Sequence, residues 1–195
     1  MTDLMSIPDD LPAPLDDGAA DHLGGLPLPS LVLPATTGGA VAVSEVASDW
    51  LVLFVYPMTG RPDLELPDGW NEIPGARGCT PQACAFRDRH AELARLGAAT
   101  FGLSVQEPDY QREMVARLEL PFPVLSDHNR EFGETLQLPT FVAVMPDGVR
   151  AVLYRRLTLI ARRGVIEHVM YPVFPPDENA AEVEKWLRAQ PTSAG

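Results

Sequence analysis

The chain has 195 residues and a formal net charge of −12 at pH 7, and 46% of its residues are hydrophobic. This length and composition predict one globular domain with a full core and some appendage. Nucleic-acid binding requires basic patches that meet phosphates, and none stands out here, so we expect no nucleic-acid partner. No apolar run reaches the roughly 18 residues of a transmembrane helix, so we expect no membrane partner.

The termini and the cysteine count bear on the cellular compartment. Residues 1–14 lack the basic region and the apolar run of a signal peptide, so a cytoplasmic location is expected. The only cysteines, Cys79 and Cys84, are too few for a disulfide framework, and the four histidines show no ligand spacing. We therefore expect neither a metal nor a cofactor. In a reducing cytosol, such a cysteine pair is more often catalytic than structural.

The N-terminal part of the chain predicts an arm and a hairpin. The first 27 residues are rich in Asp, Pro, Gly and Ala, which predicts a flexible, extended acidic arm with little core of its own. Two short apolar runs at 31–33 and 40–43 are separated by turn residues and predict a β-hairpin. We therefore expect an arm over 1–27, a main domain over 28–190 and a short tail over 191–195.

The rest of the chain alternates between strand and helix patterns. Residues 50–56 form a continuous apolar run that predicts a buried central strand, and a long loop over 58–78 follows it. Loops of this length inside a domain are often functional. Beyond the loop the patterns predict helices over 81–96, 109–118, 129–136 and 178–189, and strands over 99–105, 122–125, 140–145, 152–161 and 165–171. This order predicts a layered α/β domain with a central sheet flanked by helices.

Both cysteines lie in the segment Gly78-Cys79-Thr80-Pro81-Gln82-Ala83-Cys84, where the first long helix begins. A thiol at a helix N-terminus meets the positive end of the macrodipole and unpaired N–H groups, which favour the reactive thiolate. Two Cα atoms five positions apart in a regular helix are about 8–9 Å from each other, beyond the ~7 Å limit for a disulfide. A disulfide between these two cysteines would therefore require the first turns to unwind. Alternatively, Cys84 is only a small buried apolar residue.

The segment Gly78–Asp88 closely resembles the active-site helix of the Q-type peroxiredoxins, the bacterioferritin comigratory protein group of the AhpC/TSA superfamily. Tyr56-Pro57, Phe101–Val105 and Pro121–Asp127 resemble neighbouring strands and a turn of that family, and the resemblance covers about Leu28 to Leu187. It implies a thioredoxin-like fold with a central mixed sheet. It also implies thiol-dependent reduction of hydrogen peroxide and organic hydroperoxides, with thioredoxin or a similar thiol as reductant.

The resemblance also implies roles for three residues. Cys79 matches the peroxidatic cysteine, which becomes a sulfenic acid, and Cys84 matches the resolving cysteine, which closes an intramolecular disulfide. Because both lie on one chain, we expect a monomer. Arg156 matches the arginine that stabilises the thiolate, and strand alternation would place Arg155 on the opposite face. A competing register, in which residues 138–141 face the cysteines, would place Arg156 away from the site.

Two features depart from the family pattern. Ala76 stands where the family has a threonine that orients the peroxide, and Thr59 or Thr80 are the candidates to supply that hydroxyl. The loop over 58–78 is also unusually long, and its Trp70 and Arg77 are candidates for the wall of the pocket. Two alternatives therefore remain open. One is a general disulfide oxidoreductase, and the other is a redox sensor with little peroxidase turnover.

Overall fold

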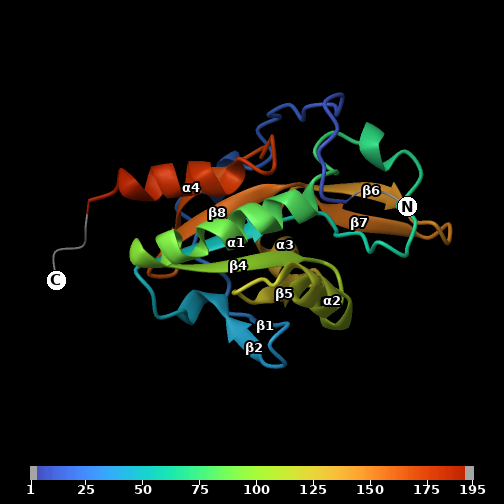
Figure 1. The fold of residues 1–195 in the computed structure, drawn as a ribbon. Helices are drawn as coiled ribbons and strands as arrows, with labels where there is room; N and C mark the ends of the chain where they lie inside the picture. Colours follow the sequence, from blue (N-terminus) through green and yellow to red (C-terminus); the bar gives the residue numbers. More distant parts are fainter. Residues whose placement is uncertain (1–3, 192–195) are drawn as a thin grey trace.

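The computed structural model describes residues 4–191, so most of the expected tail over 191–195 lies outside the described residues. Its central element is β3 (Trp50–Val55), in which all six residues are buried. The central sheet has the order β5-β4-β3-β8-β9 (Figure 1). The other strands are β4 (Ala98–Ser104), β5 (Val124–Ser126), β8 (Leu157–Arg162) and β9 (Val165–Met170). Because β4 is parallel and β8 antiparallel to β3, the sheet is mixed, as expected.

Helices cover one face of this sheet. They are α1 (Cys79–Arg95), α2 (Pro108–Leu118) and α4 (Asn179–Arg188), and α1 packs beside α4 (Figure 1). Alternate residues of β3, among them Val52 and Phe54, join these helices in one apolar cluster that also contains both cysteines. Successive strand residues point to opposite faces, so a strand buried on both faces places half of its side chains against this layer.

The opposite face of the sheet is covered by the N-terminal part of the chain and by α3 (Glu131–Leu136). The hairpin expected there is confirmed, with β1 (Val32–Pro34) antiparallel to β2 (Ala40–Ala42). Two short 3-10 helices flank it, η1 (Asp21–Leu23) and η2 (Val43–Glu45). Leu23 and Leu28 are buried in the core, so the end of the N-terminal segment is fixed to the domain.

One sequence prediction was wrong, because the strand expected over 152–161 is two strands. β7 (Arg150–Tyr154) pairs with β6 (Thr140–Val144) in a separate two-stranded sheet, whereas β8 belongs to the central sheet. The break falls at Arg155 and Arg156, where the Arg155 N–H donates to the Pro139 carbonyl at 2.8 Å. Both strands are apolar, so hydropathy alone does not show the change of sheet. Strand alternation therefore does not determine where these two arginines point.

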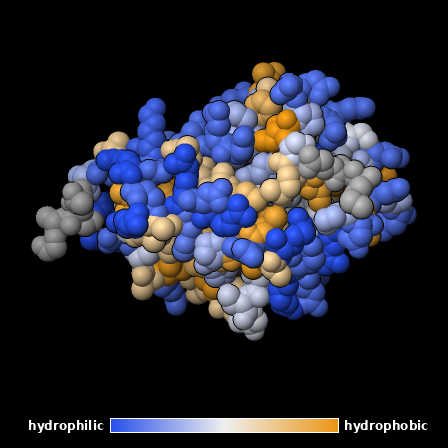
Figure 2. All heavy atoms as spheres, in the orientation of Figure 1, coloured by the Kyte–Doolittle hydropathy of each residue, from blue (hydrophilic) through white to orange (hydrophobic). Residues whose placement is uncertain are grey.

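The loop over 58–78 packs against the small β6–β7 sheet. It contains a 3-10 helix, η3 (Trp70–Glu72), and its Met58, Trp70 and Ala76 form an apolar cluster with Ala143 and Leu153 of that sheet. The loop is therefore an ordered layer beside the beginning of α1. In the view of Figure 2, hydrophilic side chains dominate the surface and apolar ones are scattered in small groups. Within residues 4–191, no helix combines the length and the hydropathy needed to cross a membrane.

Candidate active site

Cys79 is the first residue of α1 and is buried, and Gly78 precedes it as the N-cap. Gly78 has φ 102°, in the left-handed region, and a Cβ atom there would collide with the ring of Pro176. Only glycine meets both demands without strain. The sequence therefore places the Cys79 thiol at the positive end of a 17-residue helix, where the partial charges of the backbone attract an anion.

The guanidinium of Arg156 lies directly against this thiol. Its Nη2 donates to Cys79 Sγ at 3.1 Å and also contacts the carbonyl oxygens of Ala76 and Arg77, both at 3.1 Å. The thiol itself lies 3.7 Å from the Ala76 oxygen. Arg156 is only 3% exposed, so little water screens its charge from the sulfur. The geometry brings Arg156 to Cys79, unlike the competing register built on residues 138–141.

A series of buried side-chain hydrogen bonds extends from the Arg156 guanidinium. Arg156 Nη1 donates to the side-chain oxygen of Gln82, and Gln82 Nε2 donates to Asn179 Oδ1 at 2.9 Å. Thr158 donates to the same Asn179 oxygen at 2.8 Å. Gln82, Thr158 and Asn179 are each 0% exposed. These hydrogen bonds therefore connect α1, β8 and the first residue of α4, and the side chains that form them are shielded from solvent.

Cys84 lies one and a half turns further along α1, and both cysteines are free thiols. It is 8% exposed and packs in the same apolar cluster as Cys79. Burial raises the pKa of the Cys84 thiol, and the nearby Arg87 partly offsets this. Both residues are helical, so the separation of about 8–9 Å between their Cα atoms applies to this state. A disulfide between them requires the beginning of α1 to unwind.

A small pocket leads to the Cys79 thiol. Its walls come from the long loop, the beginning of α1 and the N-terminal segment, and the lining residues are Leu4, Met58, Gly60, Leu66, Trp70, Arg77, Gly78, Cys79 and Thr80. Trp70 and Arg77 therefore line the pocket, as the sequence suggested. The side chains of Leu4 and Leu66 meet over Gly60, where a Cβ atom would lie within 3.1 Å of both. Aliphatic side chains therefore cover the Gly60 side of the pocket, whereas Arg77 and Thr80 add polar groups to its lining.

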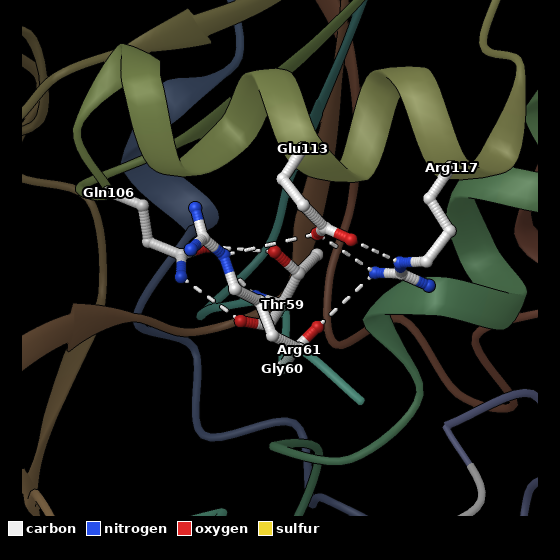
Figure 3. A network of polar contacts seen from close by, with 6 residues as sticks. All are labelled: Thr59, Gly60, Arg61, Gln106, Glu113 and Arg117. Atoms are coloured by element: carbon white, nitrogen blue, oxygen red, sulfur yellow. Dashed lines mark hydrogen bonds and ion pairs between the residues drawn. The ribbon is translucent and has the colours of Figure 1, made fainter. Parts of the chain in front are cut away.

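The two candidate hydroxyl groups lie in different places. Thr80 lines the pocket, whereas the Thr59 hydroxyl donates to Gln106 Oε1 at 3.1 Å (Figure 3). Ala76 is fully buried and presents its carbonyl oxygen to the thiol and to Arg156. Of the two candidates, Thr80 is therefore the one on the pocket wall.

The beginning of the long loop is held by a second polar network (Figure 3). The backbone N–H of Thr59 donates to Gln106 Oε1 at 2.8 Å, and Gln106 Nε2 donates to the Thr59 carbonyl at 3.0 Å. Arg117 of α2 donates to the Gly60 carbonyl at 3.3 Å and pairs with Glu113 at 2.7 Å. The loop that walls the pocket is thus tied to α2 at its first residues.

Sequence reasoning missed part of the site. Gln82 stands inside the motif, but its partner Asn179 follows it by 97 residues and lies in no motif. Tyr56 packs in the same buried apolar cluster as Cys79. Burial raises the pKa of the Tyr56 hydroxyl, and the electrostatic effect of Cys79 adds to this rise. Tyr56 was recognised only as the end of a strand. The pocket residues Leu4 and Leu66 gave no signal at all.

The fold is that of the thioredoxin-like class, and it places a buried cysteine at a helix N-terminus. The Redoxin family model matches residues 24–187, so the chain belongs to the Redoxin family. Chloroplastic peroxiredoxin Q of Oryza sativa subsp. japonica is 26% identical over 165 residues, which cover 85% of this chain and 66% of the relative. This chain thus spans slightly less than two thirds of the length of that relative.

Solved structures agree with the fold. Peroxidoxin BcpB of Mycobacterium tuberculosis superposes with a TM-score of 0.68 at 24% identity, covering 86% of this chain and 97% of the other. Peroxiredoxin Q of Xanthomonas campestris gives a TM-score of 0.65 at 20% identity, with 93% and 98% covered. The thioredoxin-like fold and the resemblance to the Q-type peroxiredoxins are confirmed.

Proposed function

We propose that this protein is a thiol-dependent peroxidase that reduces hydrogen peroxide and organic hydroperoxides. The observation that carries the proposal is the buried Arg156 guanidinium, 3.1 Å from the Cys79 sulfur, at a helix N-terminus and beside a pocket. A fixed positive charge at this place favours the thiolate and also meets the negative charge that develops on the leaving oxygen. The peroxiredoxin Q relatives support the same activity.

The first step is nucleophilic attack. The Cys79 thiolate attacks one oxygen of the hydroperoxide, the O–O bond breaks, and the other oxygen leaves as an alcohol or water by taking up the proton that the thiol released on ionisation. Cys79 is thereby oxidised to a sulfenic acid. Arg156 holds the sulfur in place through its hydrogen bond, and the backbone N–H groups at the beginning of α1 are available to the peroxide oxygens.

The second step joins the two cysteines. The Cys84 sulfur attacks the sulfenic sulfur, its S–H proton and the hydroxyl group leave together as water, and an intramolecular disulfide forms. A dithiol reductant of the thioredoxin type then attacks the disulfide and is itself oxidised. Because both cysteines belong to one helix, no second subunit has to supply a residue, which supports a monomer. The need for such a reductant supports a reducing compartment such as the cytoplasm.

The substrate range follows from the pocket. Leu4, Met58, Leu66 and Trp70 contribute apolar side chains to its lining beside the polar Arg77 and Thr80, and this apolar part supports organic hydroperoxides as substrates beside hydrogen peroxide. Reduction of alkyl peroxides is also the subject of the structural work on the bacterioferritin comigratory protein of Xanthomonas campestris, a neighbour with a TM-score of 0.65. We expect no metal or cofactor to take part, because the thiols carry the chemistry.

The test is peroxide consumption with dithiothreitol as reductant, for wild type beside Cys79→Ser and Cys84→Ser. We expect Cys79→Ser to abolish turnover. When peroxide is added without dithiothreitol, Cys84→Ser is expected to retain the first oxidation and to accumulate sulfenic and then sulfinic acid at Cys79, because no resolving thiol is present. Equal consumption in wild type and Cys79→Ser would refute the proposal. A slowly formed disulfide without turnover in the wild type would instead support a redox sensor.

A further inference from the structure

The C-terminal part of the chain contacts the active site at three points. The Val173 N–H donates to the Arg156 carbonyl at 3.3 Å, the Pro176 ring packs on Gly78, and Asn179 accepts a hydrogen bond from Gln82. Of these three contacts, only the one made by Asn179 reaches a side chain within the stretch of α1 that has to unwind.

Asn179 is itself a fixed point. Its side-chain oxygen also accepts from Thr158 of β8 at 2.8 Å, and its Nδ2 lies 3.6 Å from the sulfur of Met170 of β9. The residue is fully buried at the beginning of α4. Because Asn179 belongs to α4 and contacts both β8 and β9, it is a fixed hydrogen-bond partner for Gln82.

Gln82 lies between the two cysteines in sequence and uses both ends of its amide. Its oxygen accepts from Arg156 and its nitrogen donates to Asn179 at 2.9 Å. Disulfide formation must move the backbone from Cys79 to Cys84, so it carries Gln82 away from both partners. Breaking these bonds leaves buried polar groups unpaired, which is costly. The Gln82–Asn179 contact therefore opposes the unwinding that the second step needs.

We propose that Asn179 is a positioning residue that, through Gln82, holds the beginning of α1 in its helical state and thereby sets how fast Cys84 resolves the Cys79 sulfenic acid. This inference rests on the proposed peroxidase function. Resolution competes with a second hydroperoxide, which transfers one oxygen to the sulfenic sulfur, leaves as its alcohol and gives sulfinic acid. The contact therefore also sets the sensitivity of the enzyme to over-oxidation.

Asn179→Ala removes the anchor from the α4 side. The net contribution of one hydrogen bond corresponds to a change of about fivefold in the helix-unwinding equilibrium. We expect resolution to become about fivefold faster and the sulfinic fraction at high peroxide to fall. The Gln82–Asn179 contact exists in the dithiol state and not in the disulfide state, so its removal destabilises the dithiol state alone. The reduction potential of the disulfide is therefore expected to become about 20 mV more negative.

The experiment compares wild type, Asn179→Ala, Gln82→Met and the double variant. Stopped-flow fluorescence separates the peroxide-dependent first phase from the peroxide-independent resolving phase, and dithiothreitol redox buffers give the potential. Both single variants should accelerate resolution, and Asn179→Ala should add nothing in the Gln82→Met background. Tyr154→Phe is the matched control, because it removes one buried hydrogen bond, to Asp127 at 2.6 Å, in the core cluster that does not include α1. This control should leave the resolving phase unchanged.

Two results would overturn the inference. One is an unchanged or slower resolving phase together with an unchanged potential in Asn179→Ala, and the other is additive effects in the double variant. If Asn179→Ala fails to show a cooperative urea transition, Gln82→Met removes the same bond from the α1 side and decides the question. A wild type without a peroxide-dependent phase would refute the peroxidase function. In that case the reduction potentials would still test the role of Asn179, because oxidised dithiothreitol can form the Cys79–Cys84 disulfide without peroxide.

Discussion

Two polar networks flank Cys79, and they differ in burial and in what they connect. The network of Arg156, Gln82, Thr158 and Asn179 is at most 3% exposed and joins the reactive sulfur to a strand and a helix. In the network of Figure 3, the side chains of Arg61, Glu113 and Arg117 are 29%, 32% and 23% exposed.

Solvent screens the charges of the second network, and exposed ion pairs of this kind contribute little to stability. Buried polar groups lose their full solvation when a partner is removed. We therefore infer that the first network controls reactivity and helix stability, while the second mainly holds the loop in register. Variants in one network and not in the other separate these two contributions.

The largest difference is expected between two arginine variants. Arg156→Ala should lower the second-order rate constant of Cys79 oxidation by about 100-fold, because it removes the charge and the donor that face the sulfur. Arg117→Ala, which removes the loop contact to the Gly60 carbonyl, is the control and should change it by less than about twofold. Stopped-flow fluorescence with hydrogen peroxide measures both. Equal rates in Arg156→Ala and wild type would remove Arg156 from the site.

A smaller effect is expected on substrate preference. Leu66→Ala shortens the apolar wall of the pocket, and the lost contact should lower kcat/KM for cumene hydroperoxide about fivefold while that for hydrogen peroxide stays nearly constant. Leu64→Ala is the matched control, because this residue belongs to the same loop but is 49% exposed and does not line the pocket. An equal loss for both substrates would show that Leu66 does not select the organic group.

The two networks should also differ in how much they contribute to the free energy of unfolding. Thr158→Val deletes one buried hydrogen bond to Asn179 and should lower the free energy of unfolding by about 1 kcal/mol. Glu113→Gln weakens the exposed pairs with Arg61 and Arg117 and should cost less than about 0.5 kcal/mol. Urea unfolding measures both changes. A larger loss in Glu113→Gln than in Thr158→Val would contradict the ranking of the two networks.

The smallest effect concerns pH. His168 stacks on Trp186 with ring centroids 4.9 Å apart, and burial lowers the pKa of its imidazole. The unfolded chain therefore binds this proton more readily, so the contribution of His168 to stability is present above its unfolded pKa and is lost as pH falls through the folded value. Unfolding free energies at about pH 7 and pH 5 should show this loss in the wild type. The pH-dependent loss should be smaller in His168→Gln, and an unchanged loss would exclude His168 as its source.

The sequence predicted the parts of the site that depend on local chemistry. A Gly-Cys pair at a helix beginning and an apolar central strand leave few alternatives, and the structure places Cys79, Cys84 and β3 accordingly. The break at Arg155 and Arg156 was not predictable, because apolar runs on both sides hide a change of sheet. The Asn179 contact depends on how α4 docks, which no local pattern encodes. The boundary between an arm over 1–27 and the domain stays a prediction.

The proposed peroxidase cycle requires that Cys79 is oxidised and then joined to Cys84. The most direct measurement is the intact mass of the reduced protein after one equivalent of hydrogen peroxide, for wild type beside Cys84→Ser. The wild type should lose the mass of two hydrogen atoms as the disulfide forms, with no dimer on a non-reducing gel. Cys84→Ser should gain one oxygen atom, located at Cys79 by peptide mapping. No mass change in either protein, or a disulfide-linked dimer in the wild type, would contradict this cycle.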